Sequence, residues 1–200
     1  MLNKDDGAAK VLSAADAASS NNFMNFEAVI GELVPFLTRE KCRFALAGAF
    51  ALHAYGLSRA TGDVDFIMDT ACRKKVIGFL EGLGYETIYQ SKGYSNHVHS
   101  LSSMGRLDFI YVEGKTADKL FSQTVDGLTI GKWSIPVPSA EHLIALKVLA
   151  MKNDPSRTFR EMADIQFLMN LPGVNQEDVK KYFDQFGMIE RYNEIKKIIQ

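Results

Sequence analysis

Two aspartates that are two residues apart, Asp63 and Asp65, point most directly to chemistry in this chain. They lie in the segment T-G-D-V-D-F-I-M, where Val64, Phe66 and Met68 alternate with them. Residues i and i+2 of a β-strand share one face of its sheet, so the pattern predicts a strand with both carboxylates on one face. Neighbouring carboxylates repel one another unless a cation lies between them, which indicates a hard divalent metal.

A third acid, Asp108, has the same setting in the later segment G-R-L-D-F-I-Y-V, where Leu107, Phe109 and Tyr111 take the opposite face. If the two strands pair, three carboxylates converge on one face of the sheet. Such a set can hold two Mg²⁺ ions and leave room for substrate phosphates. The alternative is that Asp108 is a surface acid on a half-exposed strand.

The elements that would position these acids follow from periodicity and from turn residues. A short buried strand ends at Gly48, and a helix closed by Gly56 separates it from the aspartate strand. The links between the later strands are too short for a crossover helix, so neighbours there should run antiparallel. In this part we expect helices over 26–37, 50–55 and 70–83, a helical turn over 115–121, and strands over 43–47, 63–68, 85–90, 96–101, 106–112 and 128–137.

After Pro138 the pattern becomes helical, with apolar helices expected over 139–151, 158–169, 176–186 and 189–199. We therefore expect an α/β (α+β) fold, in which a small mixed sheet with covering helices precedes a C-terminal helical bundle. The expected domains are a flexible N-terminal segment over 1–22, an α/β core over 23–138 and a helical region over 139–200. A helix over 8–18 is the alternative for the N-terminal segment.

Composition is ordinary for a soluble globular protein: 46% of the 200 residues are hydrophobic, 24% are charged and the net charge is −1. We expect a cytoplasmic protein with no membrane partner, since no apolar run reaches membrane-spanning length. Cys42 and Cys72 have no metal-ligand spacing and are expected to be reduced thiols. His97 and His99 share a strand face, but without a cysteine or third histidine we expect a polar strand face near the acids, not a zinc site.

The Gly48-Ala49 turn, the segment T61-G62-D63-V64-D65 and the later strand aspartate resemble the nucleotidyltransferase superfamily of DNA polymerase β. Within it the chain is most similar to minimal and AbiEii-type nucleotidyltransferases, some of which are toxins of toxin–antitoxin pairs. The resemblance covers roughly residues 43–169. It implies Mg²⁺-dependent transfer of a nucleoside monophosphate from an NTP to a hydroxyl, with two Mg²⁺ ions, or Mn²⁺ in their place.

The resemblance also implies roles for individual residues. Asp63 and Asp65 would bind Mg²⁺ and the triphosphate, and Asp108 would bind the second metal and activate the acceptor hydroxyl. Gly48 would let the backbone approach the phosphates, whose charge the following helix N-terminus favours. Ala49 stands where many relatives have Ser or Gly, so any phosphate contact there must come from backbone N–H.

Four further residues are candidates for nucleotide binding. Lys147 is the only charge in L-I-A-L-K-V-L-A-M and needs either a partner or a route to water. The resemblance implies that Lys147 and Asp164 approach the nucleotide; the alternatives are a Lys147 that extends to solvent and an ordinary helix pair of Arg160 with Asp164. Arg59 could meet phosphate or be a loop cation, and Thr61 could support the site by hydrogen bonding or simply begin the strand.

The sequence leaves the acceptor open among tRNA, a protein and a small molecule, and it leaves open a partner antitoxin. Three other functions remain as alternatives. The first is a phosphate-handling hydrolase that uses the same acids. The second is a nucleotide-binding or protein-interaction module in which Ala49 reflects lost catalysis, and the third is a toxin acting on tRNA or on a protein.

Overall fold

The computed structural model describes Val11–Leu12 and residues 24–199. The chain divides into two compact units, Met1–Val137 and Pro138–Gln200. The expected flexible segment 1–22 lies outside the described residues except for the strand β1 (Val11–Leu12). A helix over 8–18 is therefore wrong at these two positions. None of the helices in the described ranges is long and apolar enough to cross a membrane.

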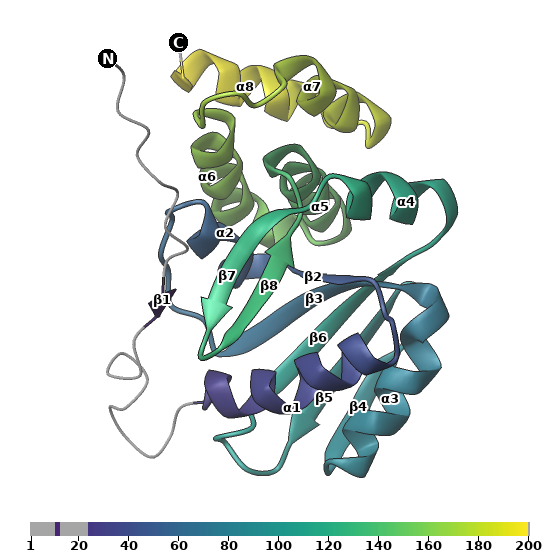
Figure 1. The fold of residues 1–200 in the computed structure, drawn as a ribbon. Coiled ribbons are helices and arrows are strands. Elements are labelled where there is room, and N and C mark those ends of the chain that lie inside the picture. Colours follow the sequence, from purple (N-terminus) through teal and green to yellow (C-terminus); the bar gives the residue numbers. More distant parts are fainter. Residues whose placement is uncertain (1–10, 13–23, 200) are drawn as a thin grey trace. The chain divides into compact units, whose positions relative to one another are not determined.

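The first unit is built on a five-stranded mixed sheet with the order β2-β3-β6-β5-β4 (Figure 1). Strands β3 and β6 are parallel, and every other neighbouring pair in this sheet is antiparallel. The antiparallel pairs β4–β5 and β5–β6 confirm the prediction that the later strands, which are joined by short links, run antiparallel. The mixed α/β fold predicted from the sequence is thereby confirmed. The strands are β2 (Phe44–Leu46), β3 (Asp63–Asp69), β4 (Tyr85–Gln90), β5 (Tyr94–His99) and β6 (Arg106–Val112).

The predicted single strand over 128–137 is wrong, because the chain reverses within it. Strands β7 (Val125–Ile130) and β8 (Trp133–Val137) form an antiparallel hairpin, which β1 extends to a second, three-stranded sheet. Gly131 lies in the two-residue link with a φ of 58° and supplies the left-handed backbone that a tight hairpin needs. Alternation runs through both strands alike, so the pattern of apolar residues conceals the turn.

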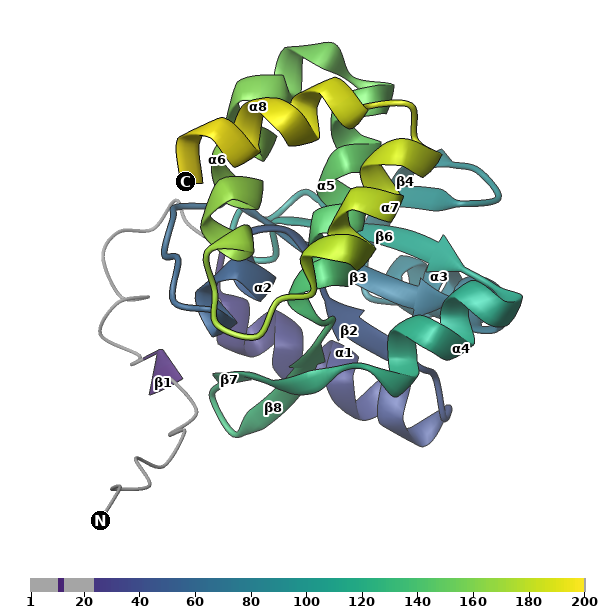
Figure 2. The ribbon, with the colours of Figure 1, turned by 90° about the horizontal axis from the view of Figure 1, so that it is seen from above.

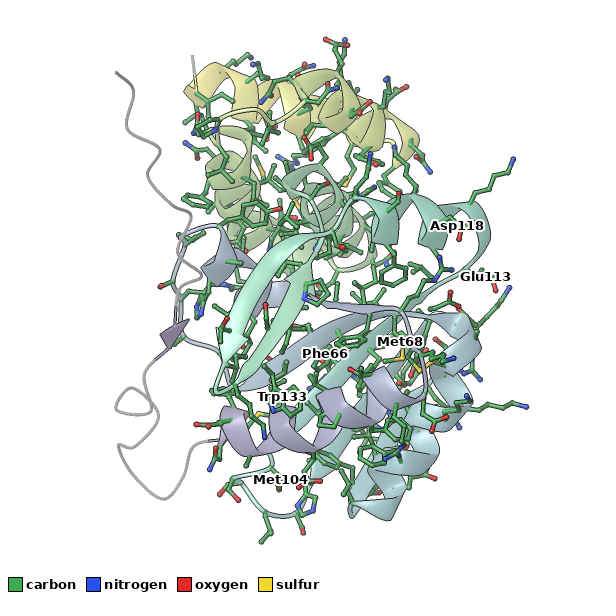
Figure 3. The ribbon with its side chains drawn as sticks, viewed as in Figure 1. Phe66, Met68, Met104, Glu113, Asp118 and Trp133 are labelled. Atoms are coloured by element: carbon green, nitrogen blue, oxygen red, sulfur yellow. A yellow bond between two sulfur atoms is a disulfide. The ribbon has the colours of Figure 1, made fainter. Side chains whose placement is uncertain are left out.

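The described residues of this unit also form four α-helices: α1 (Phe26–Arg39), α2 (Gly48–Ala54), α3 (Arg73–Gly82) and α4 (Gly114–Ser122). Phe36 of α1 stacks on Phe79 of α3 with ring centroids 3.9 Å apart, so these two helices pack against each other. On β3, the alternate residues Val64, Phe66 and Met68 are fully buried. Figure 3 labels Phe66 and Met68 of this set. The apolar face of the aspartate strand is therefore part of the core, as the alternation predicts.

Cys42 and Cys72 form a disulfide, so the expectation of reduced thiols is wrong. Cys42 follows α1, and Cys72 ends the short 3-10 helix η1 (Thr70–Cys72) that follows β3. Antiparallel pairing of β2 with β3 brings these segments together and leaves the two Cα atoms 5.8 Å apart, within the usual range for a disulfide. Because the cysteines are 30 residues apart in the sequence, spacing alone gives no sign of this proximity.

The second unit consists of α5 (Ala140–Asn153), α6 (Thr158–Met169), α7 (Gln176–Gln185) and α8 (Ile189–Ile199), joined through the short 3-10 helix η2 (Pro155–Arg157) and brief loops. All four α-helices lie where the apolar periodicity predicts them. Helix α5 packs against α6 and α7, and α8 packs against the same two helices (Figure 2). Ile144, Ile165 and Phe183 are fully buried among them and form part of this unit's core.

Candidate functional site

Asp65 of β3 and Asp108 of β6 are direct partners in a parallel register. Paired residues of neighbouring strands point to the same face of a sheet and lie about 5 Å apart. The two carboxylates are therefore side by side. Asp63 lies two residues before Asp65 on the same strand, so it shares this face.

The turn before α2 lies directly against Asp65. Gly48 has a φ of 56°, and a Cβ at this position would lie 1.8 Å from Oδ2 of Asp65. The Ala47 backbone N–H also donates a 2.8 Å hydrogen bond to the Asp65 carbonyl oxygen. Only glycine can therefore place the backbone this close to the carboxylate while adopting this conformation. The next residue, Ala49, is buried and has only a methyl side chain, so the turn offers no polar side chain at that position.

Asp108 is 4% exposed and is held by three donors among the described residues. Its Oδ2 accepts from the Tyr94 hydroxyl at 2.9 Å. Its Oδ1 accepts from Asn96 Nδ2 at 2.6 Å and from Arg106 Nε at 2.9 Å. Asn96 Nδ2 also donates to the Tyr94 hydroxyl oxygen at 2.8 Å. The third acid thus lies in a polar network, not in the apolar interior.

The sequence analysis missed all three of these donors. The predicted strand over 96–101 begins two residues later than β5, which left Tyr94 outside it. The available signal was alternation: Arg106 is two residues before Asp108 on β6, and Asn96 is its direct partner across the antiparallel ladder. Identifying Asn96 requires the register in which β5 pairs with β6, and a single sequence does not determine that register.

Electrostatics keep these donors in the protonation states that the hydrogen bonds require. Burial raises the pKa of Tyr94, and the neighbouring charge of Asp108 raises it further. The hydrogen bond to Asp108 raises the pKa of Arg106. At neutral pH Tyr94 is therefore a neutral phenol that can donate, and Arg106 is a cation beside the Asp108 carboxylate.

Thr61 and Arg59, the loop residues before β3, have different surroundings. The Thr61 hydroxyl donates to the Asp63 carboxylate and, at 3.3 Å, to the Asp63 backbone carbonyl, so Thr61 contacts a candidate site residue. The Arg59 backbone N–H donates to His53 Nε2 at 3.1 Å, which ties this loop to the end of α2.

Lys147 belongs to the helical unit and is 6% exposed, so the alternative of a side chain that extends to solvent is wrong. Its Nζ donates to Asp164 Oδ2 at 2.6 Å and to Glu161 Oε2 at 3.0 Å, and both acids are buried. Glu161, which the sequence analysis missed, also accepts from Arg157 Nη2 at 2.6 Å. Burial alone would raise the pKa of Glu161, but Lys147 and Arg157 outweigh it and lower that pKa.

His97 and His99 lie on the opposite face of the sheet from the acids, because His97 pairs with Leu107 while Asn96 pairs with Asp108. The expectation that they form a polar face near the acids is therefore wrong. His97 is fully buried, with Nε2 2.8 Å from Ser95 Oγ and Nδ1 3.1 Å from Thr87 Oγ1. Burial lowers the pKa of His97.

The acidic face offers the oxygen donors that Mg²⁺ prefers, with two carboxylates abreast and a third on the same strand. Within the described ranges, no three His, Cys, Asp or Glu side chains are gathered closely enough to surround one ion. Asp63 accepts from Thr61 and Asp108 from its three donors. The carboxylate oxygens of this face therefore fit Mg²⁺ in their chemistry. In the structure, Asp63 and Asp108 accept hydrogen bonds from neighbouring side chains.

No family model and no curated protein matches the sequence. Several solved structures match the fold of the chain. The antibiotic-resistance factor ANT(2'')-Ia, solved in solution, matches with a TM-score of 0.61 and 12% identity over 86% of this chain and 95% of its own. Its crystal structure in complex with adenylyl-2''-tobramycin gives a TM-score of 0.61 and 14% identity, over 83% of this chain and 98% of its own.

The lincosamide antibiotic adenylyltransferase LnuA, bound to lincomycin, matches with a TM-score of 0.52 and 17% identity over 75% of this chain and 99% of its own. A nucleotidyltransferase-like protein from Paracoccidioides brasiliensis matches at 0.54 and 13% identity, over 88% of this chain and 92% of its own. At these identities the likeness concerns the fold. The chain has the nucleotidyltransferase-like fold that its sequence motifs predict, and the finer resemblance to AbiEii-type proteins stays a prediction.

Proposed function

We propose that this protein is a Mg²⁺-dependent nucleotidyltransferase that moves a nucleoside monophosphate from an NTP to a hydroxyl acceptor. The observation that supports this most is the register pairing of Asp65 with Asp108, with the Gly48 turn set against Asp65. In the reaction, the acceptor oxygen forms a bond to the α-phosphorus. The bond from that phosphorus to the oxygen bridging to the β-phosphate breaks, and pyrophosphate leaves.

Asp63, Asp65 and Asp108 would hold two Mg²⁺ ions, or Mn²⁺ in their place. When bound, such ions neutralise phosphate charge and stabilise the attacking and leaving oxygens of an in-line displacement. Asp108 accepts the proton of the acceptor hydroxyl. Thr61 orients Asp63 through its hydroxyl, and the glycine at position 48 lets the turn backbone approach the phosphates.

Lys147 and Asp164 remain candidates for nucleotide binding under this proposal. Lys147 already has two buried carboxylate partners, so it would need to rearrange or to act as part of a preformed ion cluster to meet a phosphate. The support for a structural role is therefore stronger than the support for direct phosphate contact. The backbone N–H of Ala49, in the Gly48 turn, and Arg59, in the loop before β3, are the remaining candidates.

For the acceptor we propose a small molecule with a hydroxyl. The support is the likeness, over nearly their full lengths, to ANT(2'')-Ia and LnuA, which were solved with adenylyl-2''-tobramycin and with lincomycin. The alternative is a tRNA or protein acceptor, as in a toxin with a cognate antitoxin. The transfer assay described below distinguishes it from a small-molecule acceptor.

A second candidate function is a nucleotide-binding module without turnover. Two observations favour it: Ala49 leaves the turn without a hydroxyl, and three donors already engage Asp108. Under this reading the protein would bind Mg·NTP but would release neither pyrophosphate nor labelled acceptor.

The test incubates the protein with Mg²⁺ and each α-labelled NTP, in parallel with an aminoglycoside and lincosamide panel, total tRNA and a protein extract. The proposal predicts labelled acceptor together with pyrophosphate, both lost in the Asp63→Asn/Asp65→Asn double variant. Release of free labelled nucleotide without labelled acceptor would identify a hydrolase. Calorimetric binding of Mg·NTP without turnover would identify a binding module.

A further inference from the structure

The two carboxylate oxygens of Asp108 are unequally occupied. Oδ1 accepts from Asn96 at 2.6 Å and from Arg106 at 2.9 Å, whereas Oδ2 accepts only from Tyr94, at 2.9 Å, among the described residues. A carboxylate oxygen offers about two lone-pair sites. The bonds to Oδ1 use both of its sites, and Oδ2 keeps one open.

Tyr94 and Asn96 form a connected pair on β5. Asn96 Nδ2 donates to the Tyr94 hydroxyl at 2.8 Å, so that hydroxyl accepts from Asn96 while it donates to Asp108. Asn96 is also the direct register partner of Asp108 and is 6% exposed. A half-buried hydroxyl and a buried amide on one strand therefore fix both oxygens of a carboxylate on the next strand.

A fixed carboxylate matters here because Asp108 must keep its orientation toward Asp65. A free aspartate side chain rotates about its terminal bond with little resistance. With Oδ1 bound on two sides and Oδ2 on one, rotation would break three hydrogen bonds, of which the one from Asn96 is buried. The one open lone-pair site is therefore held in a defined direction on the acidic face.

We infer that Tyr94 and Asn96 are positioning residues, which hold Asp108 so that the open site of Oδ2 is directed toward a metal ion on the acidic face. This inference rests on the proposed function. Partners that hydrogen-bond a ligating carboxylate typically change metal affinity or activity by roughly 10- to 100-fold when they are removed. The phenol of Tyr94 donates throughout the neutral pH range, since burial and Asp108 raise its pKa.

The variant Tyr94→Phe removes the hydroxyl and keeps the ring, and Asn96→Ala provides a second, independent loss. Tyr89→Phe is the matched control. Tyr89 lies on the neighbouring strand β4, directly opposite Asn96, and is 55% exposed. The control therefore removes a tyrosine hydroxyl from a neighbouring position of the same sheet. Tyr89 is not one of the three residues that donate to Asp108.

The first readout is binding of Mn²⁺ alone, followed by its paramagnetic resonance signal in protein without nucleotide. We expect Tyr94→Phe and Asn96→Ala to weaken Mn²⁺ binding by roughly 10- to 100-fold and Tyr89→Phe to change it less than about twofold. Thermal unfolding of each variant checks that the fold is retained. Wild-type affinity in folded Tyr94→Phe and Asn96→Ala would overturn the inference.

A double-mutant cycle distinguishes positioning from a general structural effect. If Tyr94 acts through Asp108, Tyr94→Phe should have no further effect on Mn²⁺ binding in an Asp108→Asn background. An equal loss in both backgrounds would overturn the inference. With active enzyme, Tyr94→Phe should lower kcat and leave the KM for NTP unchanged.

These outcomes separate the inference from the proposed function. A wild-type protein that binds Mn²⁺ but transfers no nucleotide contradicts the proposed function, and the cycle still measures the role of Tyr94. A wild-type protein that transfers nucleotide while Tyr94→Phe and Asn96→Ala match it in Mn²⁺ binding contradicts only the inference. A wild-type protein without Mn²⁺ binding overturns the inference.

Discussion

Asp65 and Asp108 face each other across a parallel β-ladder, 43 residues apart in sequence and adjacent in space. Two carboxylates at this spacing repel each other strongly unless hydrogen-bond donors or cations compensate them. The structure supplies Tyr94, Asn96 and Arg106 to Asp108. Under the proposed function, this relationship lets the acidic face hold a metal ion, and it leads to the predictions below.

Gly48→Ala should destabilise the protein and disturb the acidic face. Its φ of 56° costs a residue with a side chain about 1–2 kcal/mol, and the new Cβ would collide with Oδ2 of Asp65. Gly56→Ala is the control, because its φ of 96° is also left-handed but no atom lies within 4 Å of the added Cβ. We expect a larger loss of unfolding free energy in urea for Gly48→Ala, and lost transfer for it alone. Equal losses in the two variants would contradict the close contact with Asp65.

Lys147→Met should lower the unfolding free energy by about 3–5 kcal/mol, because it leaves two buried carboxylates, Glu161 and Asp164, without their shared cation. Lys181→Met, which breaks an exposed pair with Asp178, should change little. Urea unfolding of the two variants compares them directly. A small effect for Lys147→Met would mean that the buried cluster is not stabilised by this lysine.

Removing both cysteines in a Cys42→Ser/Cys72→Ser variant should lower the unfolding free energy by about 3–4 kcal/mol, since the bridge closes a loop with a sequence separation of 30 residues. Reductant should destabilise the wild type by a similar amount and leave the variant unchanged. Thiol titration of the unfolded, unreduced wild type checks the pairing. Two free thiols there would contradict the disulfide.

Much of the acidic face could be predicted from the sequence, because strand alternation is local. Asp63 and Asp108 each lie beside apolar residues whose burial determines the side to which the acids point. Two of the partners that hold Asp108, Tyr94 and Asn96, could not be predicted, since they reach it through an antiparallel register. The Cys42–Cys72 bridge is hidden for the same reason: its proximity depends on the pairing of β2 with β3.

Acid should destabilise the protein from about pH 6.5 downward through His97. Burial holds the pKa of this histidine below its ordinary value of 6.5, although Asp108 and Glu81 oppose the shift. Below pH 6.5 the unfolded chain therefore binds a proton at His97 more readily than the folded protein does. The contribution of His97 to the free energy of unfolding is complete above pH 6.5, and it falls as the pH drops toward the lower pKa of the folded state. Melting temperatures between pH 7.5 and 5.5 should fall less steeply in His97→Gln. Identical slopes would contradict this assignment.

The central claim is that the carboxylates of β3 and β6 act together on a metal-bound nucleotide. The most direct measurement is the rate at which Asp65→Asn transfers labelled nucleotide with Mg²⁺, compared with the wild type and with Asp69→Asn. Asp69 is on the same strand and face but pairs with Arg43. The account predicts a loss on the order of 10²–10³-fold for Asp65→Asn and a near-wild-type rate for Asp69→Asn. An unchanged rate in folded Asp65→Asn protein would contradict it.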